Sequence, residues 1–222
     1  MISHEHRCIF IHIPKCGGTS IEESLGYHRL GLRRGGQDHR RLVSMQRAIW
    51  PPSFGVYHPA EFVRFLKQRR FASTGGHAVA SKPQYENYFK FTVIRNPWDR
   101  AYSWYRNVVR DPLHRRAFRV SEDCTFEAFM HDHLGCWALD PQMDWLTDRD
   151  GTVRVDYVGR FETLNDSYNE ARAQIGLEPI VLNKLLHSDQ KDYRHAYTDE
   201  LRERVAEKYA EEITLFAYSF DD

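Results

Sequence analysis

The stretch CIFIHIPKCGGTSI, residues 8–21, has the pattern of a buried strand followed by a tight turn and a helix. Its apolar opening has a length that suits a strand covered on both faces of a sheet. Pro14 then ends the strand, and Gly17 and Gly18 permit backbone conformations and close approaches that a Cβ would forbid. The order of strand, glycine turn and helix predicts an α/β fold.

The turn also has the composition of an anion-binding site. The N–H groups of a glycine turn and the positive end of a helix dipole favour a phosphate. Lys15 adds a mobile charge beside them, and Thr19 and Ser20 are expected to cap the helix. A Walker A loop has its Lys after the glycines, whereas Lys15 precedes them here and no GK[ST] occurs in the chain. Phosphate binding is therefore predicted, but an ordinary ATP loop is disfavoured. A buried strand and turn without a ligand is the alternative.

A second informative stretch is FKFTVIRNPWDRAYSWYRN, residues 89–107. Its apolar start predicts a short strand, and Pro97 is placed to open a helix. Arg95 then lies at the strand tip and Ser103 about a turn and a half into the helix, so a guanidinium and a hydroxyl can converge on one phosphate. This spacing predicts a second anion site. The alternative is a surface ion pair between Arg95 and Asp99.

Composition limits the class of protein. A chain of 222 residues is long enough for one sizeable core, so one domain over residues 1–222 is expected. Further strand and helix patterns with short connections favour a central parallel β-sheet flanked by helices. Lys and Arg number 31 and Asp and Glu also 31, which leaves no overall field to attract nucleic acid or a membrane surface.

The cysteines and the apolar runs indicate the cellular compartment of the protein. The chain lacks a C-x-x-C pair, so neither a zinc site nor a disulfide framework is indicated and no metal is expected. No apolar run approaches the roughly 18 residues of a membrane span, and residues 1–7 lack the apolar core of a signal peptide. A cytoplasmic protein without an integral membrane segment is expected, although the sequence does not tell whether an N-terminal anchor has been removed.

Both anion motifs resemble those of one enzyme family. HIPKCGGTS, residues 12–20, resembles the 5′-phosphosulfate loop of sulfotransferases that use 3′-phosphoadenosine 5′-phosphosulfate (PAPS), in particular the carbohydrate-type, family 2-like branch. Residues 95–103 fit that superfamily's 3′-phosphate motif, R-[ND]-P-x-[DE]-R-x-x-S. The resemblance extends from Cys8 to the C-terminus. It implies a P-loop-like α/β domain, as in a cytosolic bacterial member.

The resemblance also assigns roles to residues. It implies that Lys15 and His77 are catalytic, His77 being the general base in the G-H pair at Gly76-His77. It implies in addition that PAPS is the donor and that no metal is needed. The residues expected to bind PAPS are Lys15, Cys16, Gly17, Gly18, Thr19, Ser20, Arg95 and Ser103.

Three other expectations concern the surroundings of the site. Cys16 stands where the family usually has Thr, and its thiol beside Lys15 is expected to have a lowered pKa and to be oxidisable. Trp137, Gln142 and Trp145 resemble a family stretch that borders the acceptor pocket, although core packing explains them equally well. Residues 183–197 are a candidate nucleotide lid or a plain surface loop.

The function expected from these features is transfer of a sulfuryl group from PAPS to a hydroxyl group. The acceptor would be a small molecule or glycan, most readily a carbohydrate or glycoconjugate, and the sequence does not identify it. One rival is an atypical nucleotide-dependent phosphotransferase, which would need Mg²⁺ and an acidic ligand for it. The other is a nucleotide-binding module without catalytic activity. The sequence predicts no oligomeric state.

Overall fold

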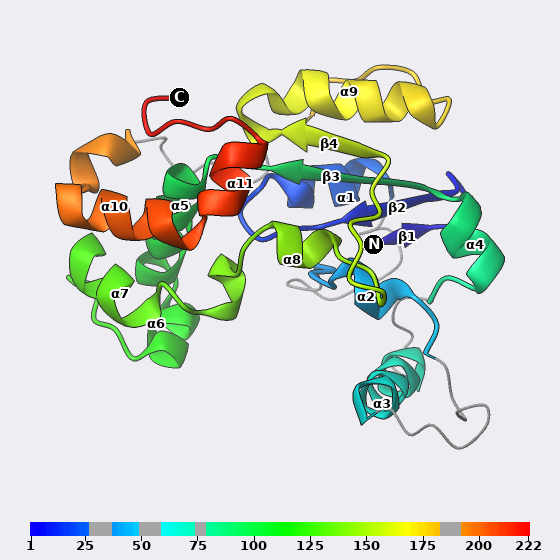
Figure 1. Ribbon diagram of the computed structural model, residues 1–222, viewed down its shortest axis with the longest axis horizontal. Coiled ribbons are helices and arrows are strands. Elements are labelled where there is room, and N and C mark those ends of the chain that lie inside the picture. The colour runs from blue at the N-terminus through cyan, green and yellow to red at the C-terminus, as the bar shows by residue number, and fades with distance from the viewer. Residues whose placement is uncertain (27–36, 49–58, 74–78, 183–191) are drawn as a thin grey trace.

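The computed structural model of the chain shows a central sheet with helices around it (Figure 1). Of the chain's 222 residues, the structure describes 1–26, 37–48, 59–73, 79–182 and 192–222.

The sheet has four strands in the order β1-β2-β3-β4. The strands β2 (Cys8–Ile11), β3 (Phe89–Ile94) and β4 (Tyr157–Arg160) are parallel to one another. A short strand, β1 (Ile2–Ser3), pairs antiparallel with β2 at one edge. The predicted α/β fold with a central, mostly parallel sheet is therefore confirmed, and the edge strand is the addition to it.

The inner strands are buried because helices cover the sheet. All four residues of β2 are buried, and so are five of the six residues of β3. The helix α9 (Leu164–Gln174) packs along β3 and β4 (Figure 1). The burial of β2 explains why its sequence, CIFI, is continuously apolar instead of alternating.

The other helices gather in two places. At one end of the sheet α5 contacts α6, α7 and α10, whereas α3 lies apart from that group (Figure 1). No helix in the described part of the chain is long and apolar enough to cross a membrane. The remaining helices are α1 (Gly18–Ser24), α2 (Leu42–Met45), α3 (Pro59–Ser73), α4 (Lys82–Asn87), α5 (Pro97–Arg110), α6 (Pro112–Phe118), α7 (Phe126–His133), α8 (Met143–Leu146), α10 (Asp199–Lys208) and α11 (Ala210–Leu215), with short 3₁₀ turns η3 (Trp137–Leu139), η4 (Phe161–Thr163) and η5 (Tyr193–Ala196).

The two helices that follow the predicted anion sites begin differently. The helix α5 starts at Pro97 as predicted, and the Asn96 side chain caps it by accepting from the N–H groups of the first turn. The helix α1 starts at Gly18, with Gly17 as its N-cap and no side-chain cap bond. The predicted capping by Thr19 and Ser20 was wrong, because both residues lie inside the first turn.

Candidate active site

The segments that follow the three parallel strands meet at the carboxyl ends of these strands, where ligands of open α/β sheets commonly bind. Gly17 comes from the loop after β2, Arg95 follows β3, and Phe161 follows β4. The Arg95 guanidinium carbon lies 3.9 Å from the centroid of the Phe161 ring. A Cβ built on Gly17 would come within 2.8 Å of a Leu164 methyl carbon. These contacts bring both predicted anion sites to the same place.

The glycines of the turn make room for the protein's own side chains. Gly17 has a φ of 77°, in the left-handed region that favours glycine. A Cβ on Gly18 would lie 2.2 Å from Cδ2 of the His12 ring, so any larger residue there would displace the imidazole. The sequence predicted that another group approaches the glycines closely, and at Gly18 this group is the His12 ring.

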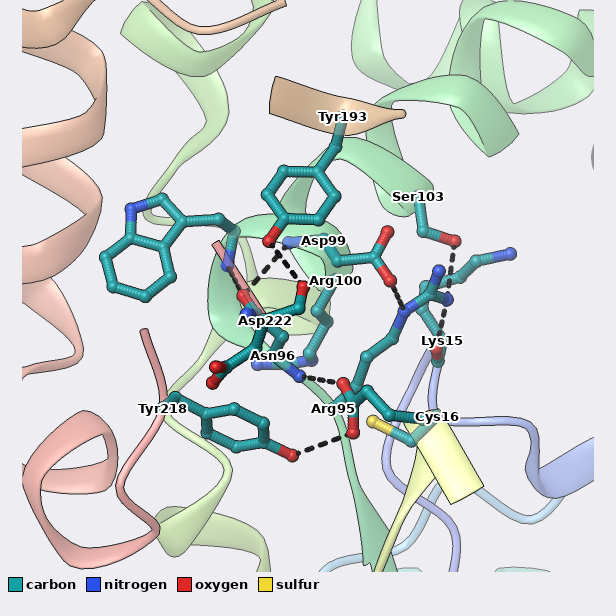
Figure 2. Close-up of polar contacts among 12 residues, drawn as sticks. Lys15, Cys16, Arg95, Asn96, Asp99, Arg100, Ser103, Tyr193, Tyr218 and Asp222 are labelled. Carbon is teal, nitrogen blue, oxygen red and sulfur yellow. Dashed lines mark hydrogen bonds and ion pairs between the residues drawn. The ribbon is translucent and has the colours of Figure 1, made fainter. Parts of the chain in front are cut away.

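Arg95 is bonded on several sides (Figure 2). Its Nε donates to Asp99 Oδ2 at 2.7 Å, and its Nη1 donates to the Lys15 carbonyl at 2.9 Å and to Ser103 Oγ at 3.1 Å. The Arg95 side chain is 7% exposed and that of Asp99 is 15% exposed. The ion pair with Asp99 thus forms together with the approach of Arg95 to Ser103. The structure brings Arg95, Ser103 and the Lys15 backbone together, whereas phosphate binding by them stays a prediction.

Lys15 carries a half-buried charge next to other cations. Its backbone has a φ of 69°, a costly conformation for a residue with a Cβ, and the bond from Arg95 holds its carbonyl in place. Its Nζ lies 3.4 Å from Asn107 Oδ1. The pKa of Lys15 is lowered to about 8, chiefly by burial and in addition by the nearby charges of Arg95 and Arg110. An anion at this position would compensate the local excess of positive charge.

The expected lowering of the Cys16 pKa was wrong. Its thiol is buried and donates to Gln142 Oε1 at 3.4 Å and toward the Pro14 carbonyl at 3.7 Å. Burial raises the pKa of Cys16 to about 12, and this effect outweighs the neighbouring arginines, which lower the pKa. The thiolate needed for oxidation is therefore disfavoured.

The stretch expected near the acceptor divides into buried and exposed residues. Gln142 is fully buried and exchanges two bonds of 2.9 Å with the backbone of Arg95. Its amide nitrogen also donates to Glu212 Oε1 at 3.0 Å, so Gln142 holds the strand tip in place. Trp145 is 2% exposed, whereas Trp137 is 52% exposed. Of the three residues, Trp137 presents an aromatic surface to solvent.

Arg100 is a buried residue that holds the loop after β2 in place. It is 1% exposed, and its Nε donates to the Pro14 carbonyl at 3.2 Å. Its two terminal nitrogens donate to the carbonyls of Ala138 at 2.6 Å and Asp140 at 3.0 Å. Arg100 therefore ties the loop after β2 to the segment that contains Trp137.

Two predicted parts of the site extend beyond the described residues. His77 lies outside them, as do residues 183–191 of the candidate lid. The rest of that segment includes η5, where the Tyr193 hydroxyl bonds to the Asp222 carbonyl at 3.3 Å (Figure 2). Within the ranges that the structure describes, no group of three or more His, Cys, Asp or Glu side chains is arranged to hold a metal ion.

The sequence also contained a signal for partners of Lys15 that were not predicted. Asn107 lies four residues after Ser103, and Arg110 lies seven residues after it. This spacing puts all three on one face of α5. Asn107 contacts Lys15, and the Arg110 charge acts on it. Extending the 3′-phosphate motif by two helical turns would have identified both residues.

Comparison with known proteins identifies the family. The sequence model described as the sulfotransferase family matches residues 1–219, nearly the whole chain. The protein therefore belongs to the sulfotransferase family, and its chemistry is transfer of a sulfuryl group. Searches among curated proteins and among solved structures gave no significant match.

Proposed function

We propose that this sulfotransferase uses PAPS as its donor and transfers the sulfuryl group to a hydroxyl group of a carbohydrate or glycoconjugate. The observation that carries the proposal is the double contact of Arg95 with the Lys15 carbonyl and with Ser103 Oγ, at 2.9 and 3.1 Å. PAPS has phosphate groups at the 3′ and 5′ positions of its ribose. Two adjoining cationic sites suit such a nucleotide, whereas ATP would leave Arg95 and Ser103 without a phosphate.

The charges of the side chains support a strongly anionic donor. The charges of Arg95 and Arg110 lie close enough to Lys15 to lower its pKa, and Asp99 is the carboxylate paired with Arg95. The donor groups at the site are an ammonium, a guanidinium, a hydroxyl and the N–H groups of the first turn of α1. This set matches phosphate and sulfate oxygens, which are acceptors.

Each residue has a distinct task in the proposed reaction. PAPS, when bound, supplies an activated sulfuryl group. Lys15 and the N–H groups of the turn stabilise the negative charge that develops on the 5′-phosphate side. Arg95 and Ser103 hold the 3′-phosphate and so position the nucleotide. His77 takes the proton of the acceptor hydroxyl, a role that rests on the sequence resemblance alone.

The acceptor is proposed to lie against Trp137. Its ring centroid is 6.2 Å from that of Trp104 and 6.2 Å from that of His39, so the exposed indole stands on an aromatic base close to the donor loop. An exposed Trp face suits the C–H surface of a sugar ring. Replacing Trp137 with Ala is expected to raise KM for the acceptor and leave nucleotide affinity unchanged.

Binding and transfer assays test the proposal in two stages. Calorimetry should show that 3′-phosphoadenosine 5′-phosphate (PAP) binds far more tightly than AMP or ATP. Labelled PAPS with a panel of mono- and oligosaccharides should then give a sulfated product in EDTA. Equal affinity for AMP would remove the 3′-phosphate assignment. Activity that is lost in EDTA and restored by Mg²⁺ would favour a phosphotransferase.

His77 provides the test of the catalytic step. Loss of a general base commonly lowers the rate about 10²–10⁴-fold, so His77→Ala should lower kcat by that order while PAP affinity stays nearly constant. His77→Ala should also abolish the loss of rate below about pH 6.5, where a histidine of ordinary pKa becomes protonated. A parallel fall in thermal stability and PAP affinity would indicate a structural residue instead.

A further inference from the structure

A chain of hydrogen bonds leads from His39 to Thr19 beside the donor loop. His39 Nδ1 lies 3.1 Å from the His12 carbonyl oxygen, and His39 Nε2 lies 3.0 Å from Gln37 Oε1. At the other end of the same amide, Gln37 Nε2 donates to Thr19 Oγ1 at 2.7 Å. Thr19 is one of the residues expected to contact the donor, so the chain connects an imidazole to the binding loop.

The polarity of these bonds corresponds to a protonated His39. The His12 carbonyl only accepts, so His39 Nδ1 must carry a hydrogen to bond to it. Gln37 Oε1 also only accepts, so His39 Nε2 must carry a second hydrogen. In this arrangement Thr19 Oγ1 accepts from Gln37, and the hydroxyl hydrogen of Thr19 is left to donate to a ligand.

A neutral His39 reverses the polarity. Its single hydrogen stays on Nδ1 for the His12 carbonyl, and Nε2 becomes an acceptor. The Gln37 amide satisfies Nε2 by turning over, which changes its shape very little because its oxygen and nitrogen ends are nearly isosteric. Gln37 Oε1 then accepts from Thr19, whose hydroxyl hydrogen points toward the amide and whose lone pairs face the ligand side.

We propose that the His39–Gln37 pair is a proton-coupled relay that sets the direction of the Thr19 hydroxyl, so that binding of the anionic donor takes up a proton at His39. The inference rests on the proposed function, since it requires a nucleotide anion at the loop. An anion accepts a hydrogen bond from Thr19 in the protonated arrangement and meets lone pairs in the neutral one. Because binding linkage is reciprocal, protonation of His39 favours binding of the anion, and binding of the anion favours protonation of His39.

The surroundings of His39 keep the relay neutral before the donor binds. The pKa of His39 is lowered to about 4, chiefly by burial and in addition by the neighbouring His12. The carboxylates of Glu22 on α1 and Asp38 next to His39 oppose this effect. A polyanion bound at Thr19 adds negative charge, so the pKa of His39 rises. The resulting gain in affinity is largest at acidic pH and is lost as the pH rises through the pKa of the bound state.

Proton uptake on PAP binding tests the relay without any measurement of turnover. Calorimetry in buffers of different ionisation enthalpy gives the number of protons taken up by the wild type and by His39→Gln, which keeps an amide at this position but does not titrate. The difference between the two proteins removes the titration of the PAP phosphates. If the bound pKa reaches about 6, the affinity should rise roughly threefold to fourfold more in the wild type than in His39→Gln between about pH 7.5 and 5.5.

A second pair of variants separates the relay from a structural role of His39. Thr19→Val removes the hydroxyl and should abolish the His39-dependent proton uptake although His39 is intact, whereas Thr19→Ser should keep it. The ¹H–¹³C resonance of the His39 ring should report a higher pKa with PAP than without it. PAP binding with an unchanged His39 pKa, or equal proton uptake in the wild type and His39→Gln, would overturn the relay alone. Absence of PAP binding by the wild type would overturn the proposed function and the relay with it.

Discussion

The two cationic regions of the site, the loop 12–17 and the segment 95–103, hold their charges in different ways. Arg95 is fixed by bonds to Asp99, to Ser103 and to a backbone carbonyl before any ligand arrives. Lys15 makes a longer contact of 3.4 Å to a neutral amide and carries a charge that burial disfavours. The segment 95–103, which is the proposed 3′ side, is therefore preorganised, whereas the loop 12–17, the proposed 5′ side, would gain most from a bound anion.

The two regions are also unequal in what they support. The Arg95 side chain holds the Lys15 carbonyl, and the Gln142 amide holds the Arg95 backbone. The Lys15 ammonium, in contrast, contacts the Asn107 side chain, which lies at the edge of the site on α5. Loss of Arg95 should therefore affect both regions, and loss of the Lys15 charge should affect one.

The largest effect is expected from Arg95→Ala. Removing one partner of a buried ion pair typically costs about 3–5 kcal/mol, and Asp99 would be left without its guanidinium. Chemical denaturation should show a loss of stability at the low end of that range or somewhat less, because Asp99 keeps some contact with solvent. Calorimetry should show that the preference for PAP over AMP is largely gone.

Arg95→Lys is the matched control for this prediction. It keeps the charge but has no planar fork to reach the Lys15 carbonyl and Ser103 together. It should recover part of the stability and little of the nucleotide preference. If Arg95→Ala were as stable as the wild type and still preferred PAP, the preorganised 3′ side would be disproved.

A smaller effect, with a characteristic pH dependence, is expected from Lys15→Met. A charge-assisted contact contributes about 1.5–3 kcal/mol, so PAP affinity at neutral pH should fall by roughly tenfold to a hundredfold. The pKa of Lys15 is lowered to about 8, so its charge is present below this pH and is lost above it. PAP affinity of the wild type should therefore fall as the pH rises beyond about 8, and Lys15→Met should lack this decline.

Lys15→Arg should bind PAP with an affinity that stays level through this range, because a guanidinium remains protonated.

The free energy of unfolding of the wild type should change in the opposite direction to its PAP affinity. The unfolded chain keeps the Lys15 proton up to its ordinary pKa of about 10.4 while the folded free protein has already lost it, so stability rises between about pH 8 and 10. The same decline of affinity in Lys15→Met would show that another group titrates.

The parts of the fold that sequence predicted are those governed by local patterns. The strand that starts at residue 8, the start of α5 at Pro97 and the order of strand and helix depend on apolar runs and on one proline. The start of α1 was missed because Gly17 itself adopts the left-handed conformation and acts as the N-cap, so the hydroxyls that follow are not needed. Cap preferences alone do not distinguish these two beginnings.

The site was predictable in its charges but not in its burial. Arg95 and Ser103 meet because helix geometry fixes their separation, and a spacing rule captures that. The high pKa of Cys16 depends on its enclosure by residues far away in sequence, among them Gln142. The bond from Gln37 to Thr19 and the contact of His39 with the His12 carbonyl likewise join segments whose packing has no local sequence signal.

The smallest expected effect is that of Ser103→Ala, which tests how far the 3′ side depends on its hydroxyl. The substitution removes one acceptor from Arg95 and leaves the bonds to Asp99 and to the Lys15 carbonyl in place. Arg95 carries the charge at this position, so loss of the hydroxyl should cost no more than the low end of the about 1.5–3 kcal/mol of a hydrogen bond to a charged group, and PAP affinity should fall roughly threefold to tenfold while AMP affinity stays constant. Ser103→Thr keeps the hydroxyl and should retain most of the PAP affinity if its added methyl group is accommodated on α5. An equal loss for PAP and AMP would mean that Ser103 supports a part of the site that both nucleotides share and does not act on the 3′-phosphate, because a contact with this group can weaken only the nucleotide that carries it.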